Sequence, residues 1–388
     1  MEEIEKIKKK YKDINISIDE ECIQVVHPDS VKVDKIFYLN ESEEGESFDF
    51  IEVNQFVDSK YIIGRFLFRE NYFEAVVDFS NTLDYYDDES TIINPSGKDF
   101  EENCYYETGS ISQEFGEFLN QSIEWDNFSS EYFHSIKIFN IDKIFNIKYT
   151  DEKYLNNTLE LCSQAFFKLS IKYGINLKLL NLHDESFSPE IDEINTESIK
   201  STIITSEGYD TDLVNYYNRA IHLPKSSFKY IAYFQVLECI FDEVYSSEKI
   251  QDTKAILNSD SFDTNNTDDI YSLIKIIDRY AKEQNDRSKI KLILEKYFKM
   301  NLHDDAYLLA YSSISSILID LKYIKDENEM KDLQKIGNII YDIRNEYTHS
   351  NRKFPKKKEN AVEIDKLDEQ IELIRLISKS IILNYNKP

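Results

Sequence analysis

The sequence predicts an α+β protein, with a β-rich mixed domain over residues 1–205 followed by an all-α domain over residues 206–388. Short runs rich in β-branched and aromatic residues, several of them alternating between apolar and polar, fill residues 22–80, as expected of half-buried strands. Beyond residue 205 this pattern fades, and apolar residues recur with helical periodicity. At 388 residues the chain is too long for one ordinary hydrophobic core, which favours two main units.

The N-terminal domain is expected to contain a mainly antiparallel sheet. Its strand-like runs are residues 22–26, 31–39, 48–53, 61–69 and 72–79. The acidic stretch Asp84–Glu89 and the turn Asn94–Gly97 interrupt the pattern. A helix is expected at about residues 111–125, because Ser110 and Gln113 have the spacing of a capping box.

Helices are predicted from the 3.6-residue period of apolar side chains. In residues 151–173 the apolar stripe consists of Leu155, Leu159, Cys162, Phe166, Leu169 and Tyr173. In the C-terminal domain the helical blocks are residues 210–221, 226–245, 268–283, 287–299, 304–324, 329–349 and 364–385. The polar segment Asp252–Asp268 is expected to be a loop between two of these helices.

The formal net charge of −27 argues against a protein that coats nucleic acid. Residues 1–150 hold 14 Lys and Arg against 33 Asp and Glu, a net charge of −19. Residues 151–388 hold the remaining 32 against 40, a net charge of −8. The acidity is therefore mostly N-terminal. In the second half, Arg344, Arg352, Lys353 and Lys356–Lys358 form a local basic cluster that could hold a polyanion.

The sequence predicts no membrane segment. The charged N-terminus lacks the apolar stretch of a signal peptide, and the most apolar long segment, Phe228–Phe241, is too short to cross a bilayer. The cysteines are far apart and indicate neither a zinc site nor a disulfide framework: Cys22, Cys104, Cys162 and Cys239. The reducing cytoplasm is the expected compartment.

The most informative segment is Tyr341–His349, in which His349 follows Arg344 by five residues. Five residues along an ideal helix rotate the side chain by about 140° beyond one full turn, so this pair would not share one face of a straight helix. Ser350–Asn351 and Pro355 are plausible stop signals. We therefore predict a helix that ends near His349, with this residue in or just past the last turn.

Three segments within about residues 209–388 together resemble the HEPN superfamily, and within it the branch seen in ApeA-like defence proteins. Arg344–His349 resembles the family's signature of an arginine, a polar residue, three further residues and a histidine. The apolar segment 228–241, which contains Leu237–Glu238, resembles the branch's first core helix and follows a segment of familiar type at residues 209–220. After the motif, a basic turn leads into a closing helix at residues 371–385.

The resemblance implies a HEPN helical bundle and a metal-independent endoribonuclease that needs no cofactor. Arg344 and His349 would be the catalytic pair, and two such pairs would face each other in a homodimer. Asn345 would support them by a hydrogen bond to phosphate or to the histidine, and Arg352 and Lys353 become candidates for RNA contact. One family variant carries a modifiable tyrosine two places after the histidine. This chain has an asparagine at that place, which argues against that form of regulation.

The family association also implies a biological role, a toxin-like effector of antiphage defence that acts by abortive infection. Candidate substrates are tRNA and mRNA, and a phage-derived or protein trigger would act on the N-terminal domain. Metal-free RNA cleavage needs a base for the 2'-OH, an acid for the 5'-oxygen leaving group and fixed positive charge at the phosphorane. A histidine exchanges protons near neutral pH and an arginine keeps its charge, so such a pair can supply these functions.

Several of the candidate residues also have a structural explanation. Arg344 could form a helix-end ion pair with Glu346 or bond a carbonyl oxygen. Glu238, on an otherwise apolar helix, could orient the site, or it could pair with an arginine for structural reasons alone. Lys356–Lys358 are more typical of a solvated loop than of an RNA contact. The alternative function is therefore an inactive HEPN scaffold that binds RNA, a nucleotide or a protein.

Two other polar segments have residue types that can bind a metal ion. His303–Asp304 has the composition of a phosphohydrolase metal pair but lacks further ligands nearby, so a helix cap by Asp304 or Asp305 is preferred. The acidic stretch Asp84–Glu89 could bind a cation, although a solvated loop is more typical. The remaining histidines are interpreted as structural: His27, His134, His183 and His222.

Overall fold

The computed structural model divides into two compact units, Met1–Glu207 and Gly208–Pro388, close to the predicted boundary after residue 205. The first unit is built on antiparallel sheets and the second on helices, which confirms the predicted α+β class. The structure describes residues 9, 16–18, 22–26, 34–38, 58–62, 65–79, 103–122, 133–145, 152–182, 202–203, 208–282, 285–298, 305–348 and 363–385.

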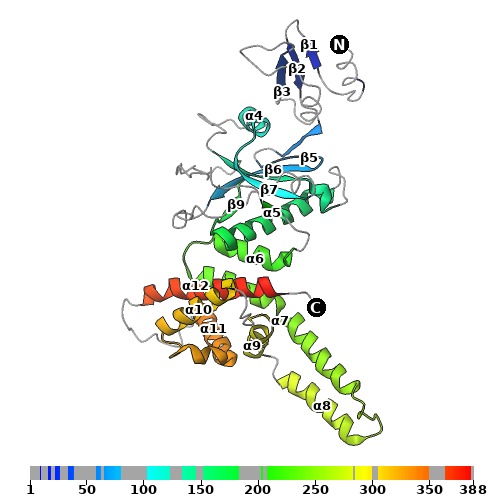
Figure 1. Ribbon diagram of the computed structural model, residues 1–388, viewed down its shortest axis with the longest axis vertical. Coiled ribbons are helices and arrows are strands. Elements are labelled where there is room, and N and C mark those ends of the chain that lie inside the picture. The colour runs from blue at the N-terminus through cyan, green and yellow to red at the C-terminus, as the bar shows by residue number, and fades with distance from the viewer. Residues whose placement is uncertain are drawn as a thin grey trace. The chain divides into compact units, whose positions relative to one another are not determined.

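Two sheets are described in the first unit, and all of their strand pairs are antiparallel (Figure 1). The smaller sheet joins β1 (Ile16–Ile18), β2 (Cys22–Val26) and β3 (Asp34–Tyr38) in chain order. The larger sheet has the order β10-β7-β8-β6-β5-β4, with β9 paired to β6. Its strands are β4 (Lys60–Ile62), β5 (Phe66–Arg69), β6 (Tyr72–Phe79), β7 (Tyr105–Ser110), β8 (His134–Phe139), β9 (Leu177–Leu179) and β10 (Thr202–Ile203).

Helix α5 (Glu152–Tyr173) packs on the larger sheet, and the two elements share one hydrophobic core. It confirms the helix predicted over residues 151–173. Three residues of its predicted stripe, Cys162, Phe166 and Leu169, are buried in one apolar cluster with strand residues. A stripe with helical spacing packs against a sheet because this removes the apolar side chains of both elements from water.

The prediction for the first unit was incomplete. The predicted run 61–69 is in fact part of a hairpin, since β4 and β5 pair and the Arg65 amide donates to the Ile62 carbonyl at 3.0 Å. Strands β7 to β10 were missed. The strand signal is weak in β7, which contains a glycine, and in β9 and β10, which have three and two residues, whereas Ile136 and Ile138 of β8 alternate with polar residues and were a usable signal. The predicted run 48–53, the acidic stretch and the Asn–Pro turn lie outside the described residues.

The predicted capping box at Ser110 was wrong. Helix α4 spans Gln113–Ser122, and Ser112 caps it, because the Ser112 hydroxyl accepts a hydrogen bond from the Phe115 amide at 3.2 Å. Ser110 is instead the last residue of β7, where it pairs with His134 of β8. Strand pairing thus extends past the residue that the spacing suggested as the cap.

The second unit contains a helix for each of the seven blocks predicted beyond residue 205. They are α6 (Thr211–Ile221), α7 (Ser227–Leu257), α8 (Thr267–Lys282), α9 (Asp286–Tyr297), α10 (Asp305–Asp320), α11 (Leu333–Thr348) and α12 (Glu363–Asn384), with a 3-10 helix, η4 (Glu327–Lys331), before α11. Within the described residues, every helix lacks either the length or the apolar character needed to cross a bilayer.

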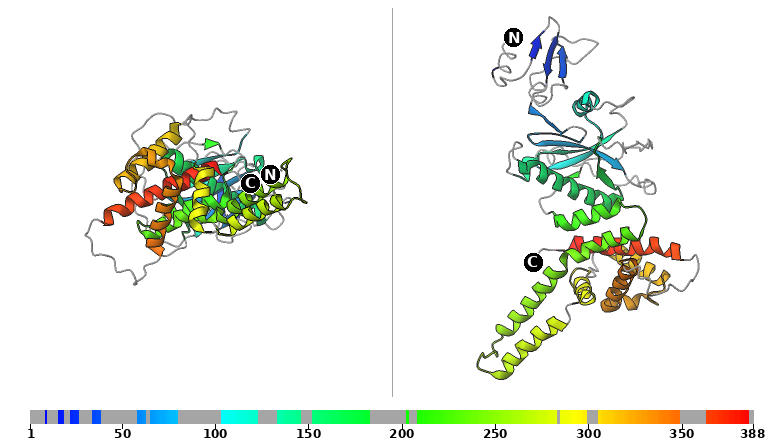
Figure 2. Two further views of the ribbon diagram at one scale, coloured as in Figure 1. Left: turned by 90° about the horizontal axis from the view of Figure 1, so that it is seen from below. Right: turned by 180° about the vertical axis from the view of Figure 1, so that it is seen from behind.

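Helix α7 is the central element of this unit. Its first half is buried against α6, α9, α11 and α12, whereas its second half extends from them side by side with α8 (Figure 2). The helix was predicted to end at about residue 245, with a loop from Asp252, and this was wrong. It continues to Leu257 and contacts α8 in this part, where Asp252 forms an ion pair with Arg279 at 2.6 Å and accepts the Tyr280 hydroxyl at 2.7 Å.

Candidate functional site

The last turn of α11 carries the candidate site, and Arg344 is its best-defined residue. One guanidinium nitrogen of Arg344, Nη2, donates to the Glu238 carboxylate of α7 at 2.9 Å. The other, Nη1, donates to the Asn345 side-chain oxygen at 3.2 Å. The guanidinium carbon also lies 5.7 Å from the centre of the Phe234 ring, within the range of a cation–π contact.

The contacts of Arg344 with Glu238 and Phe234 come from a single stripe of α7. Tyr230, Phe234 and Glu238 are spaced four residues apart and therefore lie one above another on the same helix face. Tyr230 is fully buried, and its hydroxyl donates to the Ile340 carbonyl at 3.0 Å, one turn before Arg344. Its ring also contacts the Tyr347 ring edge to face, with centroids 5.4 Å apart. The face of α7 that fixes the arginine thus also fixes the backbone that carries it.

A second set of polar contacts, from α12 and the turn after α10, holds the same turn. The Tyr347 hydroxyl donates to Oε1 of Gln370 on α12, and Nε2 of Gln370 donates to the Tyr323 hydroxyl at 2.6 Å. Tyr323 follows α10 in a tight turn, in which Lys322 has a left-handed φ of 60° and the Tyr323 amide donates to the Leu318 carbonyl at 2.9 Å. Helix α7, helix α12 and the turn after α10 are therefore linked at the last turn of α11.

Helix α9 packs closely against the preceding turns of α11. Arg287 donates to the Asn338 side chain at 3.1 Å, forms an ion pair with Asp342 and lies 4.6 Å from the centre of the Tyr341 ring. Gly337 faces α9 at this contact, where a Cβ would lie 3.4 Å from the Ile290 side chain and 3.5 Å from the backbone nitrogen of Lys291, so there is room for a methyl group but not for a large side chain. Packing against α9 thus fixes the position of α11 along its length.

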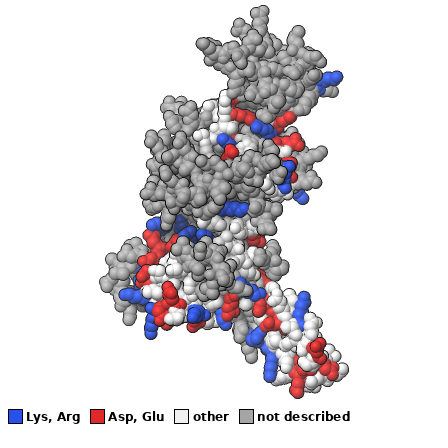
Figure 3. All heavy atoms as spheres, in the orientation of Figure 1, with Lys and Arg blue, Asp and Glu red and all other residues white. Residues whose placement is uncertain are grey.

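The electrostatics of the site are local. Figure 3 shows acidic and basic side chains interspersed over the described surface of the helical unit on the face in view. Burial raises the pKa of Tyr230 well above its ordinary value. Burial also raises the pKa of Tyr323, although the hydrogen bond from Gln370 partly offsets the effect, and the nearby Glu346 adds to it. Both phenols therefore stay protonated across the physiological range and act as hydrogen-bonding groups rather than as acids or bases.

The structure brings together three of the predicted site residues, Arg344, Asn345 and Glu238. Arg344 pairs with Glu238 and not with Glu346, the partner considered in the structural alternative. The arginine side chain is 22% exposed, and its described contacts use two of the five N–H donors of a guanidinium. It can therefore present fixed positive charge and further donors to an anion.

Other predicted residues lie outside the described residues. Helix α11 is described as far as Thr348, so the predicted position of His349 at the helix end stays a prediction. The same holds for the predicted RNA contacts Arg352 and Lys353 and for Lys356–Lys358. Sequence reasoning missed Phe234, although its position four residues before Glu238 on an apolar helix was a usable signal. Gln370 had no comparable signal, because one polar residue near the start of a helix is ordinary.

No group of three or more histidine, cysteine and acidic side chains that could hold a metal ion occurs in the described part of the chain. The candidate pair His303–Asp304 falls outside that part.

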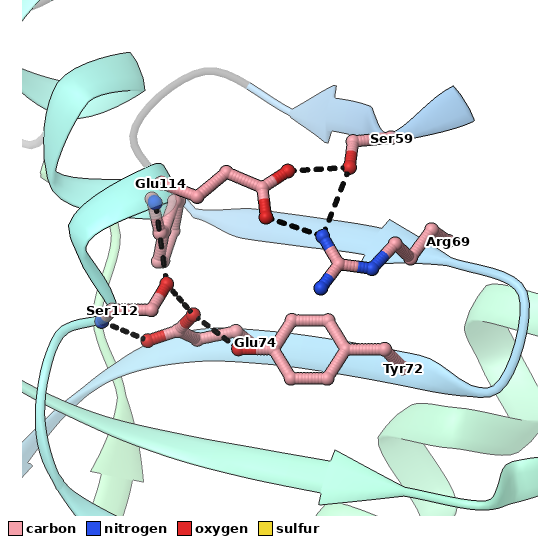
Figure 4. Close-up of polar contacts among 7 residues, drawn as sticks. Ser59, Arg69, Tyr72, Glu74, Ser112 and Glu114 are labelled. Carbon is pink, nitrogen blue, oxygen red and sulfur yellow. Dashed lines mark hydrogen bonds and ion pairs between the residues drawn. The ribbon is translucent and has the colours of Figure 1, made fainter. Parts of the chain in front are cut away.

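The first unit contains a buried polar cluster around Glu74 (Figure 4). Glu74 of β6 is fully buried, and its carboxylate accepts hydrogen bonds from the Ser112 amide at 2.8 Å and from three hydroxyls, those of Tyr72, Ser112 and Ser135. Nearby, Arg69 pairs with Glu114, which also accepts the Ser59 hydroxyl at 2.6 Å. Protein donors occupy the buried carboxylate, so the cluster anchors the start of α4 to the sheet.

Comparison with known proteins gives no match to a family model, to a curated protein or to a solved structure.

Proposed function

We propose that this chain is a metal-independent endoribonuclease of HEPN type, with Arg344 and His349 as catalytic residues. The observation that carries the proposal is the fixed Arg344 guanidinium, which Glu238, Asn345 and Phe234 hold on the last described turn of the helix before His349. A guanidinium oriented in advance stabilises charge that develops in a transition state without first having to reorganise.

The chemistry follows from the two side chains. His349 takes the proton of the RNA 2'-OH, and the 2'-oxygen forms a bond to the adjacent phosphorus. The bond between phosphorus and the 5'-oxygen breaks, and that oxygen takes up a proton, from His349 of either subunit in a dimer. Arg344 stabilises the charge on the phosphorane through its remaining N–H donors. The products are a 2',3'-cyclic phosphate and a 5'-hydroxyl.

The wider role rests on the resemblance to HEPN proteins. In this proposal the chain is a homodimer, in which two Arg344–His349 pairs form one composite site, and Arg352 and Lys353 contact the RNA. The first unit responds to a phage-derived or protein trigger, and cleavage of tRNA or mRNA then causes abortive infection.

The direct test is incubation of the purified protein with total RNA and with tRNA in EDTA, followed by sequencing of the RNA ends. The wild type should leave cyclic phosphate ends, and Arg344→Ala and His349→Ala should each lower the cleavage rate by about 10²- to 10⁴-fold. Wild-type cleavage rates in both variants, or activity that EDTA abolishes, would show that the proposal is wrong.

The Arg344–Glu238 ion pair also favours a second candidate, an inactive HEPN scaffold that binds RNA, a nucleotide or a protein. In that case Arg344 is a brace between α11 and α7, and its charge serves only to match Glu238. The two candidates differ in one result, because a scaffold retains its binding but cleaves no RNA, even when the protein is folded and dimeric.

A further inference from the structure

The contacts of Gln370 are unusual for the interior of a helical unit. The residue is only 5% exposed and lies on α12 next to Ile371 and Ile374, which are buried as well. Both ends of its amide are used, since Oε1 accepts the Tyr347 hydroxyl and Nε2 donates to the Tyr323 hydroxyl at 2.6 Å. A side-chain amide carries one acceptor end and one donor end, so it can join two phenols in a fixed order.

Such a chain of polar groups gives little net stability. A buried hydrogen bond replaces bonds to water, and replacing all of its partners by apolar groups of similar shape can be nearly neutral. What a fully satisfied network does provide is a unique geometry, because any displacement leaves a buried polar group without its partner. The feature that this network fixes is the position of Tyr347, three residues after Arg344.

The ring of Tyr347 and the backbone beside it are fixed as well. Its ring contacts Tyr230, whose hydroxyl bonds the Ile340 carbonyl, and the Thr348 hydroxyl donates to the Arg344 carbonyl at 2.9 Å. Movement of Tyr347 would therefore rotate the whole last turn and shift Arg344 relative to Glu238. Because the Gln370 amide stands between the two phenols and does not titrate near neutral pH, the network acts through geometry and not as a proton relay.

We propose that Gln370 is a positioning residue for catalysis, which acts through Tyr347 to set the orientation of the α11 turn that carries Arg344, with Tyr323 as the anchor of the network. This inference rests on the proposed ribonuclease function. Gln370 itself touches neither RNA nor the reacting atoms. Misplacement of a catalytic group by about 1 Å can cost about 100-fold in rate, so a network that contributes little to stability can have a large effect on catalysis.

The test is an apolar version of the network in the full chain, the triple variant Tyr323→Phe/Gln370→Leu/Tyr347→Phe. Because all polar partners are removed together, the melting midpoint should stay within about 4 °C of the wild type. RNA cleavage should show kcat lowered about 10- to 100-fold, with KM within about threefold of the wild type. Tyr280→Phe is the matched control, since it removes a phenol bonded to Asp252 away from α11, and it should retain the wild-type kcat.

A triple variant that is folded and cleaves with the wild-type kcat would overturn the inference, while the loss of cleavage in Arg344→Ala would still support the proposed function. If the triple variant does not fold, Tyr323→Phe decides the question. This change removes only the outermost hydroxyl, and we expect a kcat about two- to fivefold lower, whereas an unchanged kcat would overturn the inference. Absence of cleavage by the wild type would overturn the proposed function and, with it, the catalytic role of Gln370.

Discussion

The carboxylate of Glu238 lies 2.9 Å from the guanidinium of Arg344, although the two residues are 106 positions apart in the chain. The side chains are 34% and 22% exposed, respectively, so the pair lies at the edge of the core and not within it. A pair in this position can stabilise the packing of α11 on α7 and can also orient the arginine. The two roles predict different results when both partners are replaced.

Replacing only the arginine should destabilise the protein. Arg344→Met keeps an unbranched side chain over Phe234 but leaves the Glu238 charge partly buried without its partner. We expect a loss of about 1–2 kcal/mol in the free energy of unfolding, less than for a fully buried pair. Arg344→Met/Glu238→Leu should recover most of this loss. Urea denaturation of the wild type, both single variants and the double variant gives the coupling energy.

Cleavage assays on the same four proteins separate the two roles. If Arg344 is catalytic, both variants that lack it should be inactive, including the double variant with restored stability. Recovery of RNA cleavage in the double variant would mean that Arg344 serves only as a brace.

The close approach of α9 and α11 at Gly337 gives a second prediction. In Gly337→Ala the new methyl group would lie 3.4 Å from the Ile290 side chain and 3.5 Å from the Lys291 backbone nitrogen, which are ordinary contact distances. The gain in helix propensity should therefore prevail, with stability unchanged or raised by up to about 1 kcal/mol. Gly337→Leu should instead lose about 1–3 kcal/mol, because the larger side chain must separate two backbones. Equal stabilities of the two variants would contradict the packing described.

The helices of the second unit were predictable from the sequence because apolar periodicity is a local signal. The second half of α7 was not predicted, because residues such as Asp252 look like loop residues until their partner Arg279 on α8 is known. The same limit applied to the sheet. β10 pairs two residues, Thr202 and Ile203, with a strand that is distant in the sequence, and no local pattern reveals this.

The candidate site was predictable to a similar extent. Arg344 and Asn345 came from a short motif, and Glu238 from its contrast with an apolar helix. The contacts that position them depend on tertiary structure, because Gln370 and Tyr323 have no fixed spacing from the motif. Residues that act by orienting others leave little trace in a single sequence.

The buried carboxylate of the first unit gives a third prediction. Both carboxylate oxygens of Glu74 accept hydrogen bonds. Glu74→Gln would replace one of these oxygens by an N–H₂ group, which would face hydroxyl or amide hydrogens, and it would also remove the charge. We expect a loss of about 2–3 kcal/mol in the stability of this unit, measured by hydrogen exchange in β6 and α4. Glu160→Gln, which changes an exposed residue of α5, is the control and should alter stability by less than about 0.5 kcal/mol. Similar exchange rates in the two variants would show that the cluster is not needed to anchor α4.

The final prediction concerns pH and His134, the first residue of β8. Burial lowers the pKa of this imidazole, and a hydrogen bond with the Gly109 backbone partly offsets the effect. The unfolded chain titrates at a pKa of about 6.5, so below that pH it binds a proton that the folded state does not accept. The contribution of His134 to stability is therefore fully present above about pH 6.5 and is lost as the pH falls through the lower folded pKa.

His134→Gln has no titrating group at this position, so the difference in unfolding free energy between wild type and variant should shrink from pH 8 to pH 5.5. Denaturation curves measured across this range give that difference, and a constant value would show that His134 is as easily protonated in the folded state as in the unfolded chain.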